Sequence, residues 1–157
     1  MKKVNREEPH VTLRTVAGQQ SAETLEDLAD WVMELTGCPP VTRTVVARCT
    51  RPAHGDEPAE WFYVEADAHE GVARLRCLAC ADVRSILDST ERWTYPQAWS
   101  CPNCRQSIAE VVFGLSERAG VAEWLLVAAR CVSCGHVSGL TDMVVPNIAA
   151  DVFAASL

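Results

Sequence analysis

The sequence lacks any hydrophobic run of the roughly 20 residues that a helix needs to cross a bilayer. No apolar run follows the two lysines near its start, so we expect neither a signal peptide nor a membrane anchor. These absences predict a cytoplasmic protein. Thiols stay reduced in the cytoplasm, and the eight cysteines are therefore expected to bind metal rather than to form disulfides.

Recognisable catalytic motifs are missing as well. The chain contains no Gly-rich phosphate loop, no Gly-x-Ser-x-Gly and no His-Glu-x-x-His. No Cys-x-x-Cys pair opens a helix inside a strand-helix-strand pattern, which argues against a thiol-disulfide oxidoreductase. The sequence therefore favours a non-catalytic protein and indicates no small-molecule substrate.

The chain contains few basic residues relative to acidic ones. The chain has 14 Lys and Arg against 21 Asp and Glu, a formal net charge of −7, and zinc bound by thiolates would bring it to about −10. Generic binding of duplex nucleic acid needs a cationic surface and is disfavoured. A local basic patch stays open, because residues 37–92 hold seven arginines among nine acidic residues.

Cysteine, by contrast, is abundant and regularly spaced. Cys101-Pro-Asn-Cys104 and Cys131-Val-Ser-Cys134 enclose two apolar runs that are expected to form a hairpin. Two Cys-x-x-Cys turns, or knuckles, brought together by a hairpin have the ligand spacing of a tetrahedral zinc site. Four protein ligands leave no open position for water, so this set, site 2, is expected to be structural.

A less regular set of ligands lies upstream. Cys77 and Cys80 form a further Cys-x-x-Cys pair, and Cys49 with His54 stands one expected hairpin before it. The gap between ligand pairs is 22 residues here (55–76) and 26 in site 2 (105–130), so an internal repeat is the simplest account. This set, site 1, is expected to bind a second zinc ion through three cysteines and a neutral histidine.

Two alternatives for site 1 stay open. In the first, Cys38 replaces His54 and gives four sulfur ligands, although Cys38 precedes two prolines and lies a whole strand away from Cys49. In the second, site 1 holds no metal.

The residue after each second ligand is expected to need a positive φ. Gly55 and Gly135 suit that position, whereas Ala81 and Arg105 at the equivalent places are departures that strain the turn without removing a ligand. His136 adjoins site 2, either as a hydrogen-bond donor to a thiolate or as an ordinary surface histidine.

The fold expected from these patterns is mainly β, small and metal-stabilised: two tandem zinc ribbons of antiparallel strands, preceded by a short strand and one amphipathic helix. A strand at 10–16, a turn at 18–20, a helix with N-cap Ser21 and C-cap Gly37, and a C-terminal helix opened by Pro146 are expected. The expected units are residues 1–40 (packing on the first ribbon), 41–92 (ribbon 1), 93–100 (connector), 101–145 (ribbon 2) and 146–157 (tail or short helix).

Residues 41–145, with their paired knuckles, resemble the zinc-ribbon (rubredoxin-like) superfamily in two copies. Cys101-Pro-Asn-Cys104 and Cys131-Val-Ser-Cys134-Gly135 match its knuckles, and the stretch from Cys49 to His54 is similar to a degenerate one. The resemblance implies a fold and a metal. Its members read nucleic acids, dock proteins or form structural lobes of enzymes, so it leaves the function open. The preference for Arg over Lys, with much Ala and Val, is typical of bacteria with GC-rich genomes.

Three functions follow as hypotheses. The first is a non-catalytic zinc protein, with two zinc ions per chain, that forms an interaction or regulatory module for a protein partner. The second is binding of RNA or single-stranded nucleic acid through Arg74, Arg76, Arg84, Trp93 and Trp99. The third is a rubredoxin-like electron carrier with iron in site 2.

Overall fold

The structure is a computed structural model that describes residues 13–16, 19–35 and 39–157, and it confirms the expected mainly β fold. Its strands are β1 (Leu13–Val16), β2 (Gln19–Ala22), β3 (Arg43–Val46), β4 (Phe62–Asp67), β5 (Val72–Cys77), β6 (Val83–Ser85), β7 (Ile108–Arg118), β8 (Val121–Cys131) and β9 (Val137–Ala149). The helices are α1 (Leu25–Glu34), the 3₁₀ turn η1 (Pro52–His54), α2 (Ser89–Arg92) and α3 (Ala150–Ser156).

Seven of the strands form one antiparallel sheet. Its order is β6-β5-β4-β7-β8-β9, and β3 also pairs with β7, farther along the edge that β4 occupies. The hairpins β4–β5 and β7–β8, expected in two ribbons, are therefore neighbours in the same sheet. The unit boundaries at 41–92 and 101–145 stay predictions.

The long hairpin β7–β8 forms the centre of the molecule and is buried on both faces. Val111 and Phe113 point into a larger core that also holds Val64 and Leu75 of the first hairpin. Val112, which lies between them in the strand, points to the opposite face of the sheet. There it belongs to a second core with Leu28 and Val32 of α1. Strands covered on both sides read as nearly continuous apolar runs, as these two do.

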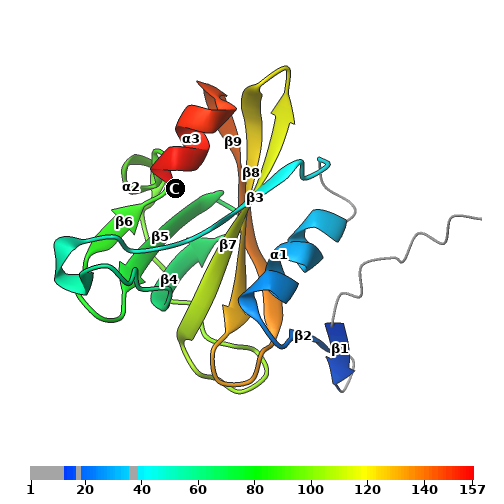
Figure 1. Ribbon diagram of the computed structural model, residues 1–157, viewed down its shortest axis with the longest axis vertical. Coiled ribbons are helices and arrows are strands. Elements are labelled where there is room, and N and C mark those ends of the chain that lie inside the picture. The colour runs from blue at the N-terminus through cyan, green and yellow to red at the C-terminus, as the bar shows by residue number, and fades with distance from the viewer. Residues whose placement is uncertain (1–12, 17–18, 36–38) are drawn as a thin grey trace, which may run out of the picture.

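The helix α1 covers the second of these cores. It lies against β3, β7 and β8 (Figure 1), so it packs on the second hairpin and also on β3, which belongs to the expected first ribbon (41–92). The reason is the alternation in β7 and β8, which leaves an apolar face on the side away from the first hairpin. Gly114 lets the helix approach, since a Cβ there would lie 2.7 Å from Cγ1 of Val32.

The sheet curls back on itself around the larger core. The turn after β4 reaches β9, where the Thr141 hydroxyl donates to the carbonyl oxygen of Asp67 at 3.1 Å. Irregular register in the β7–β8 and β8–β9 pairings accompanies this curvature. The helix α3 closes one end of the molecule (Figure 1). Its Phe153 is buried, and its Asp151 pairs with Arg43 of β3 at 2.8 Å.

The connector between the two hairpins lies along the part of β4 that does not pair with β7. The amide of Trp99 donates to the carbonyl of Val64 at 2.8 Å, and the amide of Ala66 donates to that of Gln97 at 3.2 Å. Trp99 packs against the larger core, whereas Tyr95 is 78% exposed.

Three local expectations are wrong. Thr24, not Ser21, is the N-cap of α1, because Thr24 forms a capping box with Asp27. Residues 19 and 20 of the turn expected at 18–20 are in a strand, since β2 already begins at Gln19. Pro146 does not open a helix: it lies in β9, an edge strand next to a register shift, where a missing N–H costs nothing. The expected C-cap Gly37 lies outside the described residues.

Within the described ranges, no helix combines the length and hydrophobicity required of a bilayer-spanning segment.

Candidate metal centres

The structure brings the eight predicted ligands together in two groups of four. Within each group, one potential ligand atom per residue lies within 4.8 Å of all the others. Site 1 consists of Cys49, His54, Cys77 and Cys80, and site 2 of Cys101, Cys104, Cys131 and Cys134. In both sites the two pairs of ligands flank a β-hairpin, β4–β5 for site 1 and β7–β8 for site 2.

Three of the four ligand pairs share one backbone turn. In each, the amide of the residue after the second cysteine donates to the carbonyl of the first cysteine at 2.9 Å: Ala81 to Cys77, Arg105 to Cys101 and Gly135 to Cys131. All three donor residues have positive φ (61°, 68° and 76°), as expected for these positions. The turn aims both thiols of a pair to the same side, which is what a shared metal ion requires.

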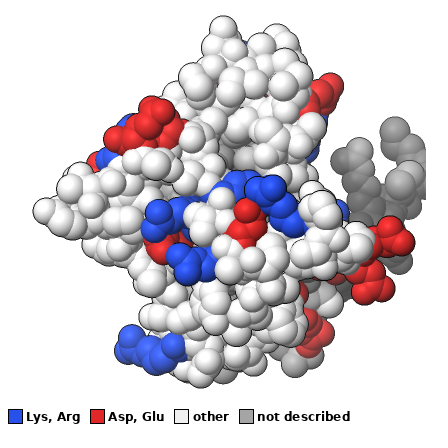
Figure 2. Space-filling model, turned by 90° about the vertical axis from the view of Figure 1, so that its left-hand side faces the viewer, with Lys and Arg blue, Asp and Glu red and all other residues white. Residues whose placement is uncertain are grey.

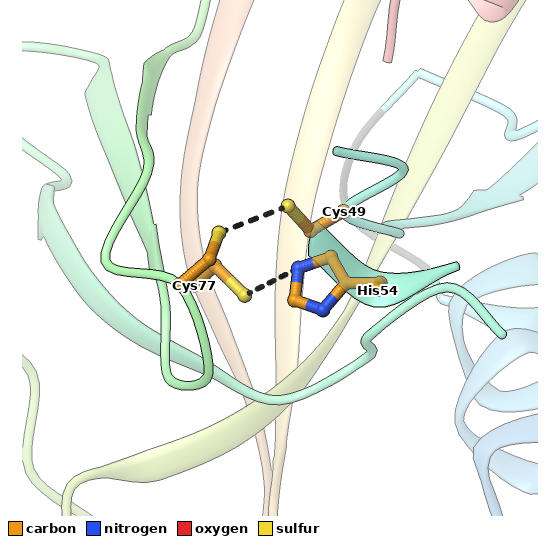
Figure 3. Close-up of side chains that lie close together, drawn as sticks. Cys49, His54 and Cys77 are labelled. Carbon is orange, nitrogen blue, oxygen red and sulfur yellow. Dashed lines mark hydrogen bonds between the residues drawn. The ribbon is translucent and has the colours of Figure 1, made fainter. Parts of the chain in front are cut away.

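The fourth ligand pair is built differently, because His54 follows Cys49 at a longer spacing than that of a Cys-x-x-Cys pair. Pro52 opens the 3₁₀ turn η1, and the amide of His54 donates to the carbonyl of Arg51 at 2.9 Å. Gly55 follows with φ 61° and ends the turn. The imidazole thereby takes the part of the second ligand of this pair and faces Cys77 (Figure 3).

The distances measured between the two ligand pairs of each site match those of a tetrahedral metal site. Sγ atoms are 3.7 Å apart for Cys49 and Cys80, and Nε2 of His54 lies 3.5 Å from Sγ of Cys77 (Figure 3). In site 2 the sulfur pairs Cys101–Cys134 and Cys104–Cys131 are 3.6 and 3.5 Å apart. Bonds of about 2.3 Å to sulfur and 2.0 Å to nitrogen place tetrahedral ligand atoms about 3.8 Å (S–S) and 3.5 Å (S–N) apart. Each group can hold one metal ion.

Disulfide bonding does not explain these clusters. A disulfide requires a sulfur–sulfur distance of about 2.05 Å, and the seven cysteines that the structure describes are all free. Cys49, Cys77, Cys101 and Cys131 are buried, and the others are half-buried. A largely buried group of unpaired thiols is therefore available as a ligand set.

The thiols of site 2 differ in acidity. Burial raises the pKa of Cys131 to about 12 and also raises that of Cys101. Burial opposes ionisation of Cys134 too, but hydrogen bonds from the Asn103 side chain and the His136 main chain lower its pKa to about 7. Cys134 is thus the thiolate most readily offered to a metal near neutral pH.

Asn103 is a contributor to site 2 that the sequence reasoning missed. Its Nδ2 donates to Sγ of Cys134 at 3.4 Å, across the two knuckles. The sequence feature that could have identified Asn103 is its position between Cys101 and Cys104. From there an amide side chain can reach a thiolate of the other Cys-x-x-Cys pair of the site. His136 acts on Cys134 as well, through its main-chain amide and not through the imidazole.

The alternative ligand Cys38 lies outside the described residues, and His54 completes the described cluster of site 1. Site 1 therefore needs no ligand from before β3.

The five residues suggested for nucleic-acid binding lie in two different places. Arg74, Arg76 and Trp93 are on the outer side of the first hairpin, where Arg74 stacks 5.7 Å above the Trp93 ring and pairs with Glu65. Arg84 and Trp99 face the other way: Arg84 is opposite buried Leu75 in the pairing of β5 with β6, and Trp99 packs on the core. They do not form one surface, and binding of nucleic acid stays a prediction.

Comparison of the chain with known family models, curated proteins and solved structures finds no match in any of the three. The function is therefore inferred from the geometry of the two centres and of the surface around them.

Proposed function

We propose that this protein is a non-catalytic zinc protein whose two closed metal centres hold together a module for binding a protein partner. The observation that carries the proposal is the pair of four-ligand clusters with tetrahedral spacing. Sulfur-rich tetrahedral sets favour Zn²⁺ or iron, and zinc is the ordinary choice for structural sites that include histidine. A full set of four protein ligands supplies folding free energy and leaves no position for a reacting water.

The candidate partner surface is the outer face of the first hairpin. Tyr63, Arg76 and Val83 stand in one row across β4, β5 and β6, and Trp61 lies on the same face two residues from Tyr63. The side chains of Trp61, Tyr63 and Val83 are 43–47% exposed. This exposed fraction is high for three large apolar residues on one face. Trp, Tyr and Arg are the residues most enriched in binding hot spots.

Metal analysis of purified protein tests the first half of the proposal. We expect two zinc ions per chain in the wild type, and one in Cys131→Ser and in His54→Ala. Cys38→Ser is the matched control and should keep both ions, because His54 completes site 1. One zinc ion in Cys38→Ser together with two in His54→Ala would show that Cys38 is the ligand. Red protein containing iron would support the electron-carrier hypothesis instead.

Crosslinking in native lysate tests the second half. We expect a specific protein partner to be captured by the wild type and lost from Trp61→Ala/Tyr63→Ala. Tyr95→Ala is the control, because Tyr95 is 78% exposed but stands on the connector. Equal capture of the same partner by both variants would contradict this surface. Capture of RNA that depends on Trp61 and Tyr63 would mean that this face binds nucleic acid instead of a protein, through residues other than those first suggested for it.

A further inference from the structure

A cavity of about 210 Å³ opens beside site 1, where the chain leaves β3 and β6 begins. Its walls are formed by Arg48, Cys49, Thr50, Arg51, Phe62, Leu75, Cys77, Asp82, Val83 and Arg84. Figure 2 shows Lys and Arg side chains gathered across the face that carries η1 and β6, with acidic side chains among them. In an acidic chain with a net charge of −7, three arginines around one small cavity are a local concentration of cationic side chains.

The three arginines reach the cavity from different segments. Arg48 and Arg51 are exposed at its rim, before and after Cys49, and each pairs with a single carboxylate. Nε of Arg48 lies 2.9 Å from Glu60, and Nη2 of Arg51 lies 2.9 Å from Asp82. A guanidinium has five N–H donors, so both retain donors for a further acceptor.

Arg84 is the innermost of the three. It lies opposite Leu75, on the core side of the sheet, and its Nη1 donates to the main-chain oxygen of Leu157. Its Nη2 is buried, and no acceptor among the described residues reaches it. Burial lowers the pKa of Arg84. A buried guanidinium with an unused donor favours a further hydrogen-bond acceptor at that nitrogen.

The local charges are close to balance. Glu60 and Asp82 offset two of the three guanidinium groups, and Zn²⁺ with three thiolates and a neutral histidine gives site 1 a charge of about −1, which offsets the third. This charge of site 1 depends on the metal proposed above. An anion is therefore favoured by the unused N–H donors of the arginines and not by a net positive charge.

We propose that this cavity is a binding site for a small tetrahedral oxyanion, either inorganic phosphate or a phosphomonoester. Guanidinium groups approaching from three segments suit an acceptor with oxygens in several directions, whereas a carboxylate offers two oxygens in one plane. The volume is below the 300–1,000 Å³ usual for larger ligands, which restricts the occupant to a small anion. The cavity opens mainly on the core side of the sheet, where Arg84 lies, and it adjoins the outer face of the hairpin at Val83.

Calorimetric titration of the metal-loaded protein with inorganic phosphate tests the proposal, with sodium chloride of equal ionic strength and sodium acetate as anion controls. We expect saturable binding of phosphate with one site per chain and none of acetate. Arg84→Gln and Arg48→Gln should each weaken binding about tenfold or more, the loss of one charged hydrogen bond. Arg118→Gln, which removes an exposed arginine outside the cavity, should bind as the wild type does.

Titration with glycerol phosphate distinguishes the two candidate ligands. Tighter binding of glycerol phosphate than of inorganic phosphate would identify the ligand as a phosphomonoester, and equal or weaker binding would identify it as inorganic phosphate. The zinc content of every variant is measured in parallel. Arg48→Gln decides the result if Arg84→Gln loses metal, since Arg48 lies at the exposed rim. Absence of saturable phosphate binding in the wild type, or unchanged affinity in Arg48→Gln and Arg84→Gln, overturns the proposal. Phosphate binding by purified protein that contains no zinc would support the phosphate site and contradict the two zinc centres.

Discussion

The main-chain amide of Ala22 donates a hydrogen bond to the carbonyl oxygen of Gly135 at 2.8 Å, and this contact seats β2 on a knuckle of site 2. A Cβ on residue 135 would lie 2.6 Å from the carbonyl oxygen of Ala22. Arg130 reinforces the contact, because its Nε donates to the same oxygen of Ala22 at 2.8 Å. The N-terminal segment and the second metal centre are thus coupled through a residue that must lack a side chain.

Gly135→Ala should destabilise the protein by about 2–4 kcal/mol, since it adds a steric clash with the main chain of Ala22 to the strain of a positive φ. Gly120→Ala is the matched control, because Gly120 has φ +75°, close to the +76° of Gly135, but no atom within 4 Å of the place that an added methyl group would occupy. We expect that control to cost about 1 kcal/mol, the strain alone. Chemical denaturation measures both, and equal losses would show that the seat of β2 on the knuckle is unimportant.

Gly114→Ala should loosen the packing of α1 and cost about 1–3 kcal/mol, because the new methyl group would lie 2.7 Å from Cγ1 of Val32. Gly139→Ala in β9 is the control, since its nearest neighbour is a Leu126 methyl at 3.9 Å, an ordinary contact. The comparison is made by thermal unfolding. A stability of Gly114→Ala equal to that of Gly139→Ala would contradict the close approach of α1 to β7.

Ala81→Gly should stabilise the protein by about 0.5–1 kcal/mol, because Ala81 has φ 61° directly after the second cysteine of a knuckle. Relief of strain exceeds the entropy that glycine adds to the unfolded chain. Ala79→Gly is the control: Ala79 lies inside the same knuckle without a positive φ, so only the entropic cost remains and stability should fall. A loss of stability in both variants would mean that the positive φ of Ala81 carries no strain.

Zinc affinity at site 2 should fall as the pH is lowered, because protons compete with the metal for sulfur. Burial raises the pKa of Cys101 and raises that of Cys131 to about 12, so both thiols are protonated at pH 7 and must lose a proton on binding. At least two protons are released, and the affinity should drop at least about 100-fold per pH unit between about pH 8 and 6. Competition with a chelator in His54→Ala, which retains site 2, measures this slope. A drop below about tenfold per unit would contradict it.

Asn103→Ala should weaken zinc binding at site 2 without removing a ligand. The Asn103 amide donates to Cys134 and contributes to lowering the pKa of that thiol to about 7. Loss of this donor should reduce affinity about 10- to 100-fold at neutral pH. Ser133→Ala is the control, a polar residue between the ligands of the facing knuckle. The same chelator competition measures both, and equal affinities would remove Asn103 from the site.

Local spacing was sufficient to identify the ligands. Cys77, Cys101 and Cys131 each open a Cys-x-x-Cys pair, and a turn of that length places two thiols on one side whatever surrounds it. The hairpins between the pairs were also readable from their apolar runs. For the same reason the residues with positive φ directly after the ligand pairs could be named in advance, since that requirement arises inside the turn.

Assembly of these pieces depended on contacts between residues far apart in the chain. The joining of both hairpins in one sheet rests on the pairing of Phe62 with Ala109, and neither strand alone indicates that partner. The position of α1 on β7 and β8 depends on the face that the first hairpin leaves free. Pro146 could extend an edge strand because β9 has no neighbour, among the strands described, that would need the missing N–H.

The amino-acid sequence by itself determined the two ligand sets, the turns that present them and the mainly β character, because each follows from interactions within a few residues. Only the tertiary structure decided that Arg48, Arg51 and Arg84 line one cavity beside site 1 and that Trp61, Tyr63 and Val83 share an outer face. Those groupings depend on strand register, where a shift of one residue exchanges the two faces of a sheet.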